Sequence, residues 1–175
     1  MENLTREYID QLMGAGKREV KFKKMHPDAV LPLYSKVGDA GMDLTAVTKV
    51  VDHAHGFVEY GTGLVPEIPE GFVGLIFPRS SISKTYYTLS NSVGVLDSNY
   101  RGEIKFRFFY NSTGVFQILS NADVLKEQGF ENEEYKVGDR IGQLIIIPYP
   151  TITPIWAEEL SNTERGEGGF GSTGK

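Results

Sequence analysis

The segment Pro78-Arg79-Ser80-Ser81 offers one guanidinium group and two hydroxyl groups directly after an apolar run over residues 71–77. Arginine binds phosphate through parallel N–H donors, and hydroxyl groups add further hydrogen bonds beside it. A phosphate chain is therefore the ligand that this segment suits, at the end of a predicted strand. The same residues also fit a simple turn, so the segment by itself leaves both interpretations open.

Residues 161–175 are a second candidate for phosphate binding, because they are rich in glycine and also contain Arg165, Ser172 and Thr173. Residues 166–171 match G-x-G-x-x-G and residues 169–175 match G-x-x-x-x-G-K, but neither match precedes a possible helix. We therefore expect neither a dinucleotide fold nor a Walker site. Glycine amides can still approach an anion closely, and Phe170 could stack on a base. We predict a lid that orders on its ligand, with a frayed terminus as the alternative.

Residues 94–103 predict a hairpin, since two β-like runs flank an Asp-Ser-Asn turn. Its tip carries an acid, Asp97, and an aromatic ring, Tyr100. Asp97 is also explained as a turn former, although that interpretation leaves Tyr100 unexplained.

Three further polar groups have less specific signals. Asp43 precedes a short apolar stretch, and Asp139 and Arg140 lie in a turn before the next strand, where they suit an ion pair as well as a catalytic role. His53 and His55 form an H-x-H pair without a third ligand nearby. We interpret these histidines as loop residues rather than as a metal site.

The segment that must position these groups, from Glu19 to Ile155, is typical of many short strands. Over residues 101–110, Ile104, Phe106 and Phe108 alternate with charged side chains. Glycine- and proline-rich turns separate the strands, and residues 152–156 close the series. This pattern predicts an all-β fold, a jelly-roll-like β-barrel.

Two segments break the β pattern. Residues 5–13 predict a short helix that Thr5 caps, with its apolar side chains on one stripe. Residues 120–123 resemble a capping box, which predicts a helix over residues 121–128, inserted between two strands.

The composition bounds the possible classes of protein. A chain of 175 residues with 40% hydrophobic and 23% charged residues fits one globular domain. The absence of cysteine excludes a disulfide scaffold and thiolate metal sites. A net charge of −5 argues against a nucleic-acid binder but permits a small anion held by local cations. We find neither a membrane-spanning run nor a signal peptide, and we expect a cytoplasmic location.

Five segments, in this order, resemble the homotrimeric dUTPase family: residues 40–44, 78–81, 94–103, 138–144 and 165–174. The resemblance spans residues 18–174 and implies a jelly-roll-like β-barrel that assembles as a homotrimer. It implies three active sites, each built from all three chains, that hydrolyse dUTP to dUMP and pyrophosphate with Mg²⁺ on the triphosphate. Such an enzyme keeps uracil out of DNA and supplies dUMP for thymidylate synthesis, in the host cytoplasm if the source is a virus.

The resemblance also implies residue roles. Asp97 matches the acid that activates or orients the attacking water, Tyr100 the aromatic ring under the deoxyribose, and Asp43 the acid that holds magnesium-bound waters. The remaining matches are phosphate contacts (Arg79, Ser80, Ser81, Gln143), the segment that reads the uracil edge (Asn91, Gly94, Val95, Leu96), the closing arm (Arg165, Phe170, Gly171, Ser172, Thr173) and a further ligand contact (Lys105).

On this basis we expect a helical segment over residues 1–16, the barrel over 17–160 and a glycine-rich arm over 161–175 that closes the active site. The helix near 121–128 and its flanks, about 115–132, resemble an insertion relative to the family. This insertion either contacts a protein partner or braces the trimer.

Two alternatives remain open. A dCTP deaminase shares the fold, but it lacks the tyrosine after the hairpin acid and needs a glutamate on the next strand, where this chain has residues Lys105 to Phe108 without an acid. A non-catalytic nucleotide sensor is the other alternative, and the presence of Asp97, Arg79 and the arm argues against it.

Overall fold

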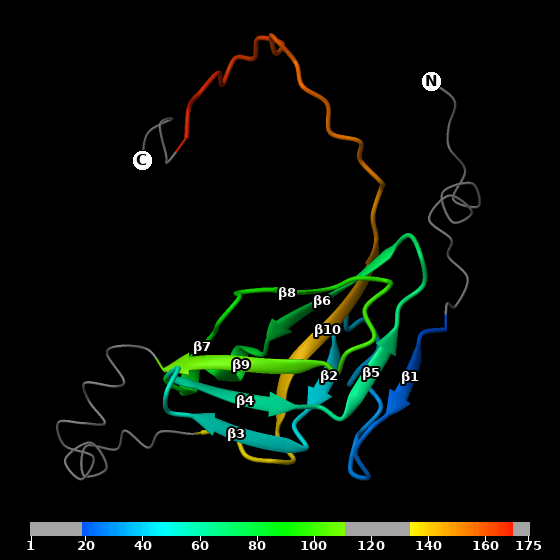
Figure 1. Ribbon diagram of the computed structural model, residues 1–175, viewed down its shortest axis with the longest axis vertical. Helices are drawn as coiled ribbons and strands as arrows, with labels where there is room; N and C mark the ends of the chain where they lie inside the picture. The colour runs from blue at the N-terminus through cyan, green and yellow to red at the C-terminus, as the bar shows by residue number, and fades with distance from the viewer. Residues whose placement is uncertain (1–18, 111–133, 170–175) are drawn as a thin grey trace, which may run out of the picture.

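The structure is a computed structural model that describes residues 19–110 and 134–169, and its regular elements are almost all strands. The only helix among these residues is the short 3-10 helix η1 (Ser80–Lys84). Figure 1 shows the strands, which are β1 (Lys21–Lys24), β2 (Met42–Thr45), β3 (Thr48–Asp52), β4 (Phe57–Gly61), β5 (Leu64–Glu67), β6 (Phe72–Pro78), β7 (Tyr87–Leu89), β8 (Gly94–Leu96), β9 (Lys105–Tyr110) and β10 (Arg140–Pro148).

The strands form two four-stranded sheets and one two-stranded sheet. The orders are β2-β10-β6-β8, β3-β4-β9-β7 and β1-β5. Every ladder between these strands is antiparallel. Two antiparallel sheets around one core confirm the predicted jelly-roll-like β fold.

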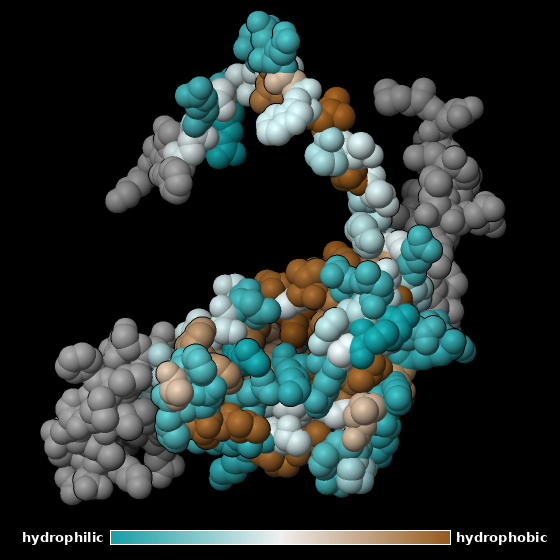
Figure 2. Space-filling model, in the orientation of Figure 1, coloured by the Kyte–Doolittle hydropathy of each residue, from teal (hydrophilic) through white to brown (hydrophobic). Residues whose placement is uncertain are grey.

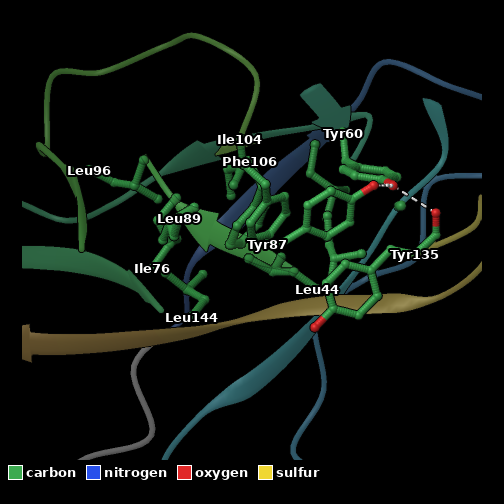
Figure 3. Packing of buried hydrophobic residues seen from close by; sticks show 14 of the residues in the cluster. Leu44, Tyr60, Ile76, Tyr87, Leu89, Leu96, Ile104, Phe106, Tyr135 and Leu144 are labelled. Atoms are coloured by element: carbon green, nitrogen blue, oxygen red, sulfur yellow. Dashed lines mark hydrogen bonds between the residues drawn. The ribbon is translucent and has the colours of Figure 1, made fainter. Parts of the chain in front are cut away.

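Side chains from both large sheets fill the core. Leu44 and Leu144 come from the first sheet, and Tyr60, Phe106 and Phe108 come from the second; all five are completely inaccessible to solvent. Figure 3 shows most of these side chains converging between the sheets. Burying each large apolar side chain contributes about 1.5–3 kcal/mol, so this shared core holds the sheets in a fixed relation.

The predicted alternation along residues 101–110 is confirmed in β9. Phe106 and Phe108 point into the core, whereas Lys105 and Arg107 are exposed. Side chains alternate between the two faces of a strand, so β9 presents two cations on its outer face and aromatic rings on its inner face.

The predicted hairpin over residues 94–103 is wrong. β8 pairs with β6, whereas β9 pairs with β4 and β7, so the chain crosses from one large sheet to the other after Asp97. Two features explain this path. Gly94 lies where any Cβ atom would overlap Ile76 of β6, and the amide of Ile104 donates to the carbonyl of Leu64, 2.8 Å away, before β9 begins.

Residues 152–156 were predicted as a strand, and this prediction is also wrong. They are extended and exposed, and no partner strand lies beside them in the described part of the chain. In Figures 1 and 2, this segment leaves the barrel after β10 and arches away from its body. The glycine-rich segment over residues 161–175 continues from it, and from here on we call residues 149–175 the arm, which the structure describes as far as residue 169.

The two predicted helices, over residues 5–13 and 121–128, lie outside the described residues. Within residues 19–110 and 134–169, no helix has the length and apolar character needed to cross a membrane.

Candidate active site

Three polar side chains meet where β2, β6 and β10 lie side by side. Asp43 belongs to β2, Arg79 follows β6, and Arg140 opens β10, which pairs with both other strands. Asp43 Oδ1 lies 2.9 Å from Arg79 Nε, and Asp43 Oδ2 lies 2.8 Å from Arg140 Nη1. Of the two interpretations left open for Asp139 and Arg140, the structure does not form the ion pair between them: Arg140 pairs with Asp43, and Asp139 accepts a hydrogen bond from the Lys136 amide.

Asp43 is well shielded from water, with a side chain 11% exposed. Burial alone would raise the pKa of Asp43, but the Ser35 hydroxyl, 2.9 Å away, and the guanidinium groups of Arg79 and Arg140 outweigh it, so the pKa lies below 3.8. One carboxylate thus holds two guanidinium groups. The cluster keeps a surplus positive charge, which suits an anion.

A polar cavity of about 260 Å³ adjoins this cluster. It is lined by two guanidinium groups, three hydroxyl groups and two carboxylates: Arg79, Arg140, Ser81, Thr85, Tyr135, Glu134 and Asp139. Both carboxylates are already bound, since Glu134 pairs with Lys49 at 2.7 Å and Asp139 accepts from the Lys136 amide at 2.6 Å. The guanidinium and hydroxyl groups are donors of the kind that phosphate oxygens accept, and we call this space the cationic cavity after its two guanidinium groups.

The other predicted phosphate contacts, Ser80 and Gln143, lie beside this cluster. Ser80 opens η1, and its carbonyl accepts a hydrogen bond of 2.8 Å from the Ser83 hydroxyl. Gln143 stands opposite Asp43 in the β10–β2 ladder, so the two side chains share one face. Gly41 lies against Gln143, where a larger residue would press on that side chain.

A second cavity, of about 370 Å³, collects the residues predicted to bind the nucleoside. The segment after β7 and strand β8 form one side, and Tyr100 and Lys105 contribute to another. Its predicted members are Asn91, Gly94, Val95, Leu96, Tyr100 and Lys105, and they are joined by Glu59, Ile76, Ser90, Glu103 and Arg107. The Ile76 side chain packs directly on Gly94, where any Cβ atom would overlap it, and this contact forms the floor of the cavity.

Backbone contacts hold Tyr100 at the edge of this nucleoside cavity. Its hydroxyl donates to the Glu103 carbonyl, 3.0 Å away, and its amide donates to the Asp97 carbonyl at the same distance. The Asp97 side chain is exposed and makes no hydrogen bond or ion pair with the described residues. Its carboxylate is therefore available to a water or to a substrate.

Among the residues of this cavity that the sequence did not indicate, Glu59 makes two ion pairs. Its carboxylate lies 2.8 Å from Lys105 Nζ and 2.7 Å from Arg107 Nε. Hydrogen bonding to Glu59 raises the pKa of Lys105. The β4–β9 ladder produces this contact between residues far apart in sequence, and no local pattern could have indicated it.

The two cavities share no lining residue within one chain. The arm does not bridge them either. In it, Arg165 Nε donates to the Gly168 carbonyl at 2.8 Å, within an exposed turn away from the barrel. The other predicted arm residues, Phe170, Gly171, Ser172 and Thr173, lie outside the described part of the chain.

The described residues contain no group of three or more side chains able to hold a metal ion by themselves. Asp43 accepts hydrogen bonds from Ser35, Arg79 and Arg140. A carboxylate has about four acceptor positions, so one remains for a water. Asp43 therefore fits a water-mediated contact with a metal ion held by a ligand, and does not fit a protein-held metal centre.

The dUTPase family model matches residues 28–123 and 124–174. A deoxyuridine 5'-triphosphate nucleotidohydrolase from Hydrogenobaculum is 40% identical over 87% of this chain and 95% of its own. Among solved structures, a variant dUTPase of Staphylococcus bacteriophage 80alpha with dUpNHpp has 26% identity and a TM-score of 0.71, over 91% of this chain and all of that one.

A variant dUTPase from phage phi11 of S. aureus, in which a structural Mg(II) ion is coordinated, has 25% identity and a TM-score of 0.57 over 84% of this chain and 97% of that one. The fold, the two cavities and these similarities over nearly the whole chain agree. The chain belongs to the dUTPase family.

Proposed function

We propose that this chain hydrolyses dUTP to dUMP and pyrophosphate, at active sites that three copies of the chain complete. One observation carries the proposal: a chain of the dUTPase family has a nucleoside cavity lined by all the residues predicted to bind the nucleoside, and a separate cationic cavity lined by Arg79 and Ser81. The product dUMP can serve thymidylate synthesis, and removal of dUTP keeps uracil out of DNA.

The nucleoside cavity supplies selectivity. Asn91 and the backbone of Gly94, Val95 and Leu96 read the uracil edge, and Tyr100 lies under the deoxyribose. A ring packed against the sugar leaves no room for a 2′-hydroxyl group, and a close-fitting edge rejects a 5-methyl group. Lys105, held by Glu59, closes the rim of this cavity.

The cationic cavity supplies charge neutralisation. Arg79 and Arg140 face the phosphate chain, and Ser80, Ser81 and Gln143 add donors at its flanks. Attack on a triphosphate needs positioning and charge stabilisation more than covalent chemistry. Asp97 orients the attacking water and accepts its proton, a role worth about 10²–10⁴-fold in rate.

Asp43 fits the role of holding waters of a magnesium ion on the triphosphate. When bound there, Mg²⁺ neutralises part of the charge on the phosphate oxygens. Asp43 keeps one acceptor position for such a water, while its other positions stay bound to Ser35, Arg79 and Arg140.

The arm supports assembly as a homotrimer. It exposes large apolar side chains that a single chain does not bury, among them Ile152, Ile155, Trp156 and Leu160. Beside β1, an apolar cavity of about 320 Å³, lined in part by Phe22, Met42 and Ile146, offers a surface of matching character. Apolar surface of this kind marks an interaction site, and a second copy of the chain is the partner we propose. The arm would then close the active site of a neighbour with Arg165 and Phe170 to Thr173.

The decisive measurement is the release of pyrophosphate from dUTP, compared with dTTP, dCTP and UTP. We expect kcat/KM for dUTP to exceed the other values by orders of magnitude. Comparable values for dUTP, dTTP and UTP would overturn the proposal. Ammonia release from dCTP, followed in the same samples, would instead indicate a deaminase.

A further inference from the structure

Tyr135, a residue that neither the motifs nor the predicted site includes, reaches the cationic cavity from the core. Its side chain is 6% exposed. Its hydroxyl oxygen lies 3.1 Å from Ser81 Oγ, and its ring lines the same cavity as Arg79 and Arg140.

The aromatic core fixes the place of this hydroxyl group. The Tyr60 hydroxyl donates to the backbone carbonyl of Tyr135 at 2.7 Å. The Tyr135 ring packs against Tyr60, Tyr87 and Phe108, with centroid separations of 6.3, 6.1 and 5.8 Å. Figure 3 shows the Tyr135 hydroxyl directed away from this cluster, on the opposite side from its bound carbonyl. A ring with two rotatable bonds, held in this way, keeps its hydroxyl at a defined point.

Either hydroxyl group can donate in this hydrogen bond, and a bound phosphate would select one direction. Each group has one proton and can also accept. Burial raises the pKa of Tyr135, so its phenol stays protonated and remains a donor. If Ser81 is to donate its only proton to a phosphate oxygen, Ser81 Oγ must accept the proton of Tyr135.

We propose that Tyr135 is a positioning residue for phosphate binding, whose hydroxyl donates to Ser81 Oγ and thereby directs the Ser81 proton to the substrate. This inference rests on the proposed function, because it assigns Ser81 to the phosphate chain. It connects the buried aromatic cluster with the cationic cavity through one hydrogen bond.

The test is a binding cycle with Tyr135→Phe, Ser81→Ala and the double variant. Tyr135→Phe removes the hydroxyl group and keeps the ring. The ligands are the triphosphate analogue dUpNHpp and dUMP, which lacks the two outer phosphates. We expect Tyr135→Phe to weaken dUpNHpp about three- to tenfold and dUMP hardly at all. In the Ser81→Ala background, Tyr135→Phe should add almost nothing.

Tyr87→Phe is the matched control, because it removes another hydroxyl group from the same aromatic cluster without a contact to Ser81. It should change Tm and leave the affinities for dUpNHpp and dUMP unchanged.

Three results would overturn the inference: unchanged dUpNHpp affinity in Tyr135→Phe, equal weakening of both ligands, or additive effects in the double variant. Wild-type protein that fails to bind dUpNHpp would overturn the inference and the proposed function together. If the wild-type protein hydrolyses dUTP but the binding cycle shows no coupling between Tyr135 and Ser81, the inference is overturned and the proposed function stands.

Discussion

Asp97 is the exposed acid to which we assign activation of the attacking water. Asp97→Asn keeps the shape of the side chain and removes the negative charge that attracts a proton. We expect kcat for dUTP to fall about 10²-fold or more, while the affinity for dUpNHpp largely survives. Steady-state pyrophosphate release and equilibrium binding measure the two quantities separately.

Asp52→Asn is the control for this variant, because Asp52 lies at the end of β3 and is bound to His55, 2.9 Å away. Its turnover should match the wild type. Near-normal turnover in Asp97→Asn would mean that another group activates the water.

Asp43 has a different role, because it links two guanidinium groups and is shielded from water. Asp43→Asn should lower the free energy of unfolding by about 1–3 kcal/mol at pH 7, since Arg79 and Arg140 then lack their shared anion. The folded state holds the pKa of Asp43 below 3.8, so this stabilisation is complete at neutral pH. This stabilisation by ionised Asp43 is lost as the pH falls below 3.8 and through the lower pKa of the folded state, where Asp43 takes up a proton.

Denaturant unfolding of the wild type and Asp43→Asn at neutral and strongly acidic pH measures how the contribution of Asp43 to the free energy of unfolding changes with pH. The difference between the two proteins should shrink on acidification. Glu70→Gln, which changes an exposed acid in the turn between β5 and β6, should show no such difference. If the wild type and Asp43→Asn differ by the same free energy of unfolding down to the most acidic pH, this interpretation of Asp43 is contradicted.

We expect the arm to contribute to activity without contributing to the core. Its described residues after β10 are almost all exposed, and none belongs to the core cluster. Truncation after Glu164 removes Arg165 and the segment predicted to cover the nucleotide. We expect most of the activity to be lost with little change in Tm, because few apolar contacts disappear. A large fall in Tm would show that this segment is structural.

The strands illustrate what sequence patterns can and cannot predict. The alternation around Phe106 and Phe108 correctly predicted one buried and one exposed face for β9, because that alternation is local. The pairing of β8 with β6 was missed, since the ladder is set by the close approach of Gly94 and Ile76.

The sites follow the same rule. Arg79, Ser81, Asn91 and Tyr100 were identified from motifs, and the structure places them in two cavities. The contacts of Glu59 and Tyr135 arise only when distant strands pair and pack. No pattern within a short window contains those contacts.

The assembled protein should show that the sites are shared between subunits. One inactive chain with Asp97→Asn and an intact arm is refolded with an equal amount of a second chain that retains Asp97 and is truncated after Glu164. If Asp97 and the arm of one site come from different chains, about a quarter of all sites in random trimers are whole. Activity should rise from almost nothing to a sizeable fraction of the wild-type value. Mixed trimers that form and stay inactive would show that each arm closes over its own Asp97.

The exposed arm also gives the protein an internal optical reporter. Trp156 is the only tryptophan of the chain, and its side chain is completely exposed in the single chain. An indole ring that moves from water into a subunit interface emits at shorter wavelength, since it leaves a polar, mobile solvent. We therefore expect the intrinsic fluorescence to shift to the blue as the protein concentration rises through the association range. Emission typical of a hydrated indole at every concentration would mean that the arm does not pack on a second chain.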